Sequence, residues 1–235
     1  PNINQEKIVK KISRKDALSE VDRVIIENEK VIGSISLKGA IFDDLSFKNY
    51  KKDLKSNENV VLLNPKDIED GYYIESGWAS VGNEVVVPGI DSLWQVKGNK
   101  VLTKKNSVVL EWDNGKGLIF KKTVRLDDKY LFKIKQEVKN NTSSKIDLYP
   151  YSQITRNKKP DDVMGFYILH EGFIGVFDGE LKEDDYDDIK DKKIVRNSDN
   201  GWLGITDKYW VTAVVPPKDK NFKSTFLYKD NYRAN

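Results

Sequence analysis

The stretch VVLEWDNGKGLIFKKTVRL, residues 108–126, decides the fold class. Apolar and polar residues alternate on either side of Asn114-Gly115, a pair that supplies the positive φ angles of a tight hairpin. In the second half of the stretch the apolar residues share one face, namely Leu118, Phe120, Val124 and Leu126. Lys122 is the one residue that fits this face poorly. A period of two is typical of half-buried β-strands, so we predict an antiparallel hairpin here.

The same alternation recurs on both sides of the hairpin. Upstream, Ile35 and Leu37 alternate with Ser34 and Ser36, which predicts a half-buried strand with the serines on its polar face. Downstream, apolar residues alternate with charged ones at Phe132, Ile134 and Val138. Short turn-forming segments separate the downstream runs, so the sequence predicts a meander of four strands that ends near Arg156.

Helical patterns are scarce in this chain. After Glu20 no stretch of a dozen residues carries a helical apolar stripe, which argues against parallel βαβ units and predicts an all-β chain with mainly antiparallel sheets. Residues 1–20 are polar and charged with a weak helical pattern, and we interpret them as a linker before a domain over residues 21–235. Lys182–Lys193 is highly charged and is predicted to be an exposed loop or a short helix.

Composition excludes several classes of function. The 235 residues contain 40 Lys and Arg against 37 Asp and Glu, a mixed-sign surface that argues against nucleic-acid binding. Cysteine is absent, which excludes disulfides, thiolate metal sites and cysteine nucleophiles. No apolar run in the sequence is long enough to cross a bilayer or to form the core of a signal peptide, so we expect the chain itself to be soluble.

The candidates for catalysis and metal binding are weak. His170 and Glu171 could form an acid–base pair, because imidazole titrates near neutral pH and a carboxylate can orient it. His170 also lies at the end of a predicted strand, and we favour a structural role in which it bonds to the backbone. The acidic residues of 184–191 lack the glycine and the terminal glutamate of a helix-loop-helix calcium site. We predict no catalytic residue, no metal site and no cofactor.

Aromatic residues suggest a binding surface. Rings can stack on sugars or hold extended peptides, and they also fill sandwich cores, which is the role we favour for the tryptophans. The residues of the candidate groove are Tyr149, Tyr151, Arg156, His170, Glu171, Trp202 and Tyr209. On these residues alone, the hypothesis is a concave sheet that binds a carbohydrate or a peptide.

Several segments, in the same order along the chain, resemble one known family. They include GSISLKGAIFDDLSFKNY at 33–50, LYPYSQITR at 148–156, FYILHEGFIGVFDGEL at 166–181 and GWLGITDKYW at 201–210. These segments resemble the large periplasmic domain of bacterial YidC-type membrane protein insertases. The resemblance implies a β-supersandwich of two large, mainly antiparallel sheets packed face to face, similar to the galactose mutarotase-like and carbohydrate-binding superfamily.

The resemblance implies a role in membrane protein insertion rather than a reaction. Such a domain is non-catalytic and periplasmic, and its parent protein lies in the bacterial inner membrane. The parent inserts and folds inner-membrane proteins, alone or with the Sec translocon. The implied partners are SecDF, the Sec translocon and nascent membrane proteins. The implied membrane helices of the parent lie outside this chain.

Two alternatives remain at this stage. The first is a carbohydrate-binding or peptide-binding β-sandwich module that uses the candidate groove. The second is a sugar epimerase similar to the mutarotases. This second alternative is disfavoured, because mutarotases use two catalytic histidines with a glutamate and this chain contains one histidine.

Overall fold

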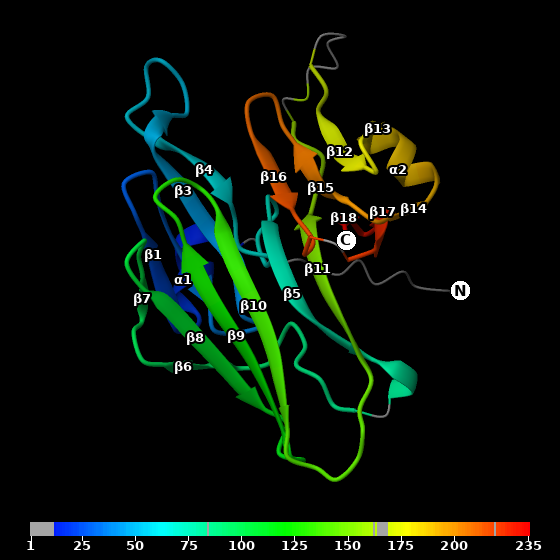
Figure 1. Ribbon diagram of the computed structural model, residues 1–235. Coiled ribbons are helices and arrows are strands. Elements are labelled where there is room, and N and C mark those ends of the chain that lie inside the picture. The colour runs from blue at the N-terminus through cyan, green and yellow to red at the C-terminus, as the bar shows by residue number, and fades with distance from the viewer. Residues whose placement is uncertain (1–11, 84, 162, 164–168, 219) are drawn as a thin grey trace, which may run out of the picture.

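Strands dominate the part of the chain that the computed structural model describes, which is residues 12–83, 85–161, 163, 169–218 and 220–235 (Figure 1). The elements up to the first predicted hairpin turn are α1 (Arg14–Ser19), β1 (Arg23–Glu27), β2 (Val31–Ser36), β3 (Ile41–Lys51), β4 (Asn59–Leu63), β5 (Tyr72–Ser80), the 3-10 turn η1 (Val81–Asn83), β6 (Gln95–Lys97), β7 (Val101–Leu102) and β8 (Ser107–Asp113). The later elements are β9 (Leu118–Leu126), β10 (Phe132–Asn140), β11 (Leu148–Arg156), β12 (Gly172–Phe177), β13 (Glu180–Asp185), α2 (Tyr186–Asp191), β14 (Ile194–Ser198), β15 (Gly201–Thr206), β16 (Val211–Val214), β17 (Phe222–Lys229) and β18 (Asn231–Ala234). The predicted all-β class is confirmed. Within the described residues, neither helix has the length and apolar character that crossing a membrane requires.

The largest sheet contains ten strands. Nine follow the order β14-β17-β18-β11-β5-β3-β2-β1-β7, and β4 pairs with β3 beside this path. Within the sheet β1 and β7 are parallel, whereas the long central pairs, such as β5 with β11 and β2 with β3, are antiparallel. β5 and β11 pair along their full length. Gly77 on β5 permits this close pairing, because the ring of Tyr151 on β11 lies only 2.9 Å from where a Cβ would stand.

Two four-stranded sheets, β10-β9-β8-β6 and β13-β12-β15-β16, cover the same face of the large sheet (Figure 1). On β5, Trp78 packs against Phe120 of β9 with 5.1 Å between ring centroids, and the Tyr72 hydroxyl lies 3.5 Å from the Ile205 carbonyl oxygen of β15. Because residues an even number apart on a strand share a face, one side of β5 contacts both small sheets. The predicted face-to-face packing of mainly antiparallel sheets is confirmed, with the second layer divided in two.

Buried apolar side chains from both layers form the core. On β9 the predicted inward face is confirmed, because its apolar residues Leu118, Phe120, Val124 and Leu126 are all buried. Lys122 has the same strand parity and is only 2% exposed. The lysine that interrupts the apolar pattern therefore points into the sandwich with its neighbours.

The predicted four-strand meander is correct for three strands and wrong for the fourth. β8, β9 and β10 pair in sequence order, but β11 crosses to the large sheet and pairs with β5 and β18. Alternation gives the faces of a strand but not its neighbours, so β11 looked like the next strand of the meander. The glycine on β5 that accommodates Tyr151 favours the pairing that the structure shows.

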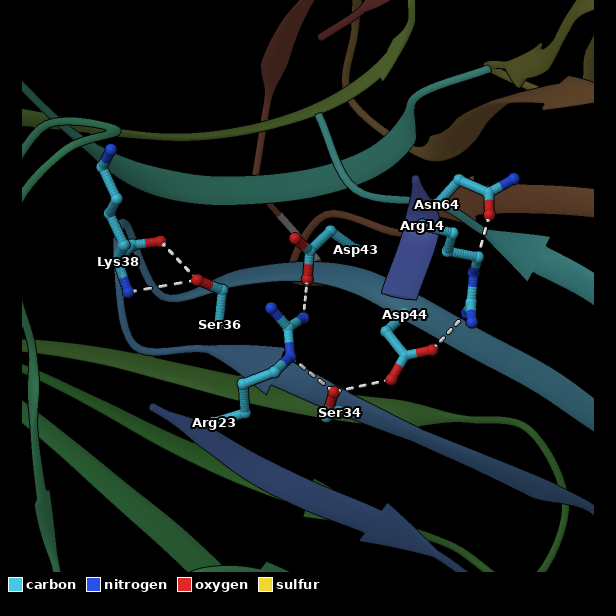
Figure 2. Close-up of polar contacts among 8 residues, drawn as sticks. All are labelled: Arg14, Arg23, Ser34, Ser36, Lys38, Asp43, Asp44 and Asn64. Atoms are coloured by element: carbon cyan, nitrogen blue, oxygen red, sulfur yellow. Dashed lines mark hydrogen bonds and ion pairs between the residues drawn. The ribbon is translucent and has the colours of Figure 1, made fainter. Parts of the chain in front are cut away.

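The prediction of a half-buried strand at Ser34 and Ser36 is also wrong, since these serines are only 3% and 4% exposed. In β3 the register with β2 skips Asp43, which forms a bulge. The bulge lets Asp43 and Asp44 both reach the side of the sheet that carries the serines. Arg14 and Arg23 pair with these carboxylates, and Arg23 also bonds to Ser34 (Figure 2).

The two short helices lie where helix signals were weak. α1 falls within the predicted linker, where Ala17 is buried and Ser13 caps the first turn. Residues 1–11 lie outside the described residues, so a linker before the domain stays a prediction. The prediction of an exposed loop or short helix over Lys182–Lys193 is correct in part: α2 forms there, but residues 182–185 belong to β13, and buried Tyr186 and Ile189 attach α2 to the core.

Candidate functional site

Arg156 lies between the layers, at the end of β11. Its Nη1 donates to Asp207 Oδ1 at 2.5 Å and lies 3.5 Å from the Tyr186 hydroxyl, while its guanidinium lies 4.6 Å from the centroid of the Tyr72 ring. Burial raises the pKa of both tyrosines far above the usual range, so both remain neutral phenols. The ion pair connects β11 to the β15–β16 turn. The positive charge of Arg156 is therefore paired with a carboxylate of the protein itself.

His170 makes the backbone contact that the structural interpretation predicted. Its Nε2 lies 2.8 Å from the carbonyl oxygen of Phe173, and its Nδ1 lies 3.6 Å from Asp185 Oδ1. Since a carbonyl only accepts, Nε2 carries the proton and the imidazole is held across the start of β12. Glu171 is buried beside it. Arg156, His170 and Glu171 therefore gather near one end of the sheet β13-β12-β15-β16.

The remaining predicted groove residues lie elsewhere. Tyr149 and Tyr151 have the opposite strand parity to Arg156, which points between the layers, so they lie on the outer face of the large sheet. Along β11, Tyr149 is about 23 Å from Arg156 at the usual rise per residue. Trp202 lies near the start of β15, whereas Tyr209 is exposed in the turn beyond its end. The structure does not bring the seven residues together into one groove.

Lys122 is a buried cation that the sequence marked only as a misfit. Its Nζ donates to the Ser76 carbonyl oxygen at 2.6 Å and lies 4.8 Å from the centroid of the Trp94 ring. Burial lowers the pKa of Lys122 to about 7, and the Coulombic attraction of Glu75 opposes that shift. Burial in turn raises the pKa of Glu75, whose position alternates with Ser76 on β5 and so lies on the other face. A charge that titrates near neutral pH is therefore built into the core.

A second buried polar cluster joins α1 to the outer face of the large sheet (Figure 2). Arg23 pairs with Asp43 and donates from Nε to Ser34 Oγ at 2.6 Å. Ser34 Oγ donates to Asp44 Oδ2 at 2.6 Å, and Asp44 pairs with Arg14 of α1. Through Nε, the Arg14 guanidinium also binds the side chain of Asn64 at 2.9 Å. The cluster holds α1 on the strands, which composition and periodicity did not predict.

The acidic segment forms local contacts. Asp184 pairs with Arg196 at 2.8 Å, and Asp187 pairs with Lys159 at 3.0 Å. Asp185 and Asp188 form a capping box at the start of α2. These carboxylates stabilise the β13–α2 segment and its neighbours, and the absence of a calcium site stays a prediction.

Two adjacent surface hollows lie beside β15 and β17. One, of about 540 Å³, is lined by Asp199, Asn200, Lys218 and Asn221. The other, of about 280 Å³, is more apolar and is lined in part by Val215, Pro216, Pro217 and Phe222. None of the seven predicted groove residues lines either hollow. The hollows are therefore not formed by the residues predicted for the groove.

Comparison with protein families gives a match over almost the whole described fold. The model of the YidC periplasmic domain matches residues 23–235, from the first strand to the end of the chain. The chain belongs to the YidC periplasmic domain family. This result confirms the resemblance inferred from the sequence, including the periplasmic character of the domain.

Individual relatives agree with the family match. A protein named membrane protein insertase YidC from Pelagibacter ubique (strain HTCC1062) is 48% identical over 235 residues, which is 100% of this chain and 42% of the relative. Insertases of the same name from Methylorubrum extorquens (strain PA1) and Jannaschia sp. (strain CCS1) are 41% and 38% identical, covering 92% and 90% of this chain. Each of those two matches covers 36% of the relative. The chain spans less than half the length of these curated relatives.

Proposed function

We propose that this chain is the non-catalytic periplasmic domain of an inner-membrane protein insertase. The observation that carries the proposal is the family match over residues 23–235, together with relatives named as insertases. In this role the parent protein inserts and folds membrane proteins, alone or with the Sec translocon. The sandwich provides a rigid surface outside the membrane for SecDF and for nascent membrane proteins.

The contacts of the polar groups support a structural rather than a catalytic role. The His170 ring is engaged with the Phe173 carbonyl, and the Arg156 guanidinium is engaged with Asp207. General acid–base catalysis needs a group that can reach a substrate and exchange a proton with it. A mutarotation assay with galactose and glucose tests this point, with no activity expected. Activity that disappears in His170→Ala would contradict the proposal.

Crosslinking tests the partner directly. A photoreactive residue at exposed positions on the outer face of the large sheet, such as Tyr149, is expected to give crosslinks to SecDF components in cells that contain the full-length insertase. Residues buried in the core provide the negative control. Absence of SecDF both from the crosslinked products at surface positions and from co-purified material would refute this partner.

The residues predicted for the groove offer two separate candidate binding places. Tyr149 is exposed on the outer face of the large sheet, and Trp202 is partly buried near the start of β15. We infer that a sugar or an extended peptide, if bound, contacts one of these places and not both. Titration with oligosaccharides and apolar peptides, with Trp202→Phe as the matched variant, distinguishes the two. No change in tryptophan fluorescence and no measurable heat of binding at millimolar ligand would refute binding at either place.

A further inference from the structure

The β9–β10 turn, the β15–β16 turn and the end of β3, which leads into the β3–β4 turn, meet around Phe47 at one end of the sandwich. The Phe47 ring on β3 stacks on Trp210 of the β15–β16 turn with 4.4 Å between centroids. It also contacts Tyr130 of the β9–β10 turn at 5.7 Å and Tyr50 near the end of β3 at 5.8 Å. Figure 1 shows the ends of β3, β9 and β15 on the same side of the molecule. The aromatic contacts join all three sheets there.

Large apolar side chains project from these turns. Leu54 in the β3–β4 turn is 106% exposed, Tyr209 is 72% exposed and Leu131 is 61% exposed. Tyr50 and Tyr130 are also exposed, while Trp210 is partly buried beneath them. We call this surface the aromatic tip and define it as Tyr50, Leu54, Tyr130, Leu131, Tyr209 and Trp210. A grouping of exposed apolar side chains of this kind marks an interaction site.

The turns that carry the aromatic tip are held by their own hydrogen bonds. Asp53 Oδ1 accepts from the backbone nitrogens of Lys55 and Ser56 at 2.8 and 2.9 Å. Asp127 Oδ1 accepts in the same way from residues 129 and 131 of the β9–β10 turn. In the third turn, the Asp207 nitrogen donates to the Trp210 carbonyl oxygen at 2.8 Å. The apolar side chains are thus presented on ordered turns.

The charges around the aromatic tip balance. Residues 50–58, 127–131 and 207–210 together contain five lysines and five acidic residues. Lys52, Lys55 and Lys129 are exposed beside the apolar side chains. Because the two signs balance, this surface has no strong field that would select a highly charged protein partner, and it can lie against lipid headgroups without strong repulsion.

We propose that the aromatic tip rests on the surface of a phospholipid bilayer. Tyrosine and tryptophan rings favour the membrane interface, a fully exposed leucine can enter the region between headgroups and acyl chains, and lysines extend their amines to the phosphates. None of these side chains lines either of the two hollows described above, and their exposure suits contact with a broad soft surface. The contact would orient the sandwich relative to the membrane. It goes beyond the proposed function, because binding to vesicles requires neither a partner protein nor insertion.

Vesicle flotation tests the proposal. The 235-residue chain is expected to float with phosphatidylethanolamine–phosphatidylglycerol vesicles. Leu54→Asp combined with Tyr209→Asp should lower the partition coefficient at least about tenfold, because each change removes apolar area that would be buried in the interface. Leu93→Asp is the control, since Leu93 is 67% exposed, close to the 72% of Tyr209, but bridges to Lys38 near the other end of β3, about 30 Å away. Circular dichroism verifies that all variants fold.

A fluorescent label reports which part of the chain touches the lipid. Because the chain has no cysteine, Leu54→Cys and Leu93→Cys each give a single site for an environment-sensitive dye. The dye at position 54 should shift to the blue with vesicles and be quenched by lipids brominated near the headgroup. The dye at position 93 should do neither.

Three outcomes would overturn the proposal. The first is equal flotation of the chain, the Leu54/Tyr209 double variant and Leu93→Asp, including no flotation of any. The second is loss of most binding in 0.5 M salt, which would show attraction by the lysines in place of apolar contact. The third is a blue shift at position 54 with an apolar peptide but not with vesicles, which would assign the aromatic tip to polypeptide.

Discussion

Replacing Lys122 with methionine should remove the pH dependence of stability that the buried Lys122 amine causes. Burial lowers the pKa of Lys122 to about 7 in the folded chain, whereas an unfolded lysine titrates near 10.4. Between these two values the unfolded chain binds a proton that the folded chain lacks. Stability of the natural chain therefore rises with pH in this window, and below about pH 7 both states are charged and the contribution levels off.

The expected change is large enough to measure. One pKa unit corresponds to about 1.4 kcal/mol, and the slope is about half of this value near pH 7, so the natural chain should gain about 2 kcal/mol relative to Lys122→Met between pH 7 and pH 9. Methionine also loses the hydrogen bond to the Ser76 carbonyl, but that loss is the same at every pH. Urea unfolding of both chains at pH 6, 7, 8 and 9 gives the difference. Parallel stability curves from pH 7 to 9 would refute the reasoning.

Three further substitutions test other parts of the fold. Asp43→Asn leaves the Arg23 guanidinium buried without its carboxylate and should cost about 3–5 kcal/mol in the free energy of unfolding measured with urea. Gly33→Ala should lower the melting temperature, since its Cβ would stand 2.0 Å from a backbone oxygen of β3, and such overpacking costs at least about 1–3 kcal/mol. Glu75→Gln removes the charge that favours protonated Lys122, so NMR titration of the lysine should give a still lower pKa.

Matched variants define what would contradict these expectations. Asp53→Asn changes an exposed carboxylate in a turn, and Gly89→Ala places its Cβ where no atom lies within 4 Å. If Asp43→Asn lowered the free energy of unfolding no more than Asp53→Asn did, the buried ion pair of Asp43 with Arg23 would contribute little to stability. If Gly33→Ala and Gly89→Ala had the same melting temperature, β2 and β3 would not approach each other closely at Gly33. A Lys122 pKa unchanged by Glu75→Gln would exclude coupling across β5.

Local structure was predictable from the sequence where a residue type or pattern favours a single conformation. The pair Asn114-Gly115 predicts a turn, which lies between β8 and β9, but only Gly115 of the pair has a positive φ, 67°, and the other positive φ of the turn, 91°, is at Gly117. The alternation along β9 correctly gave its inward face, and it placed Lys122 there despite its charge. The sheet that β11 joins was not predictable in this way, because the alternation of apolar and polar residues along the strand would be the same in either sheet.

The candidate site was less predictable, because it depends on contacts between distant parts of the chain. Tyr151 and Arg156 are neighbours in sequence, yet their strand parity sends them to opposite faces of β11. A one-residue bulge at Asp43 decides which face the neighbouring carboxylate takes. The lysine misfit at position 122 was the one sequence signal of a buried polar group, and its partner Ser76 lies 46 residues away.

The size and membrane association of the native protein test the central claim most directly. An antibody raised against this chain should detect a product at least about twice as large as its 27.0 kDa, and this product should stay in the membrane after carbonate extraction. That result would agree with the family match and with relatives of which this chain covers 42% or less. A product near 27.0 kDa that carbonate releases completely would contradict the assignment to a membrane protein insertase.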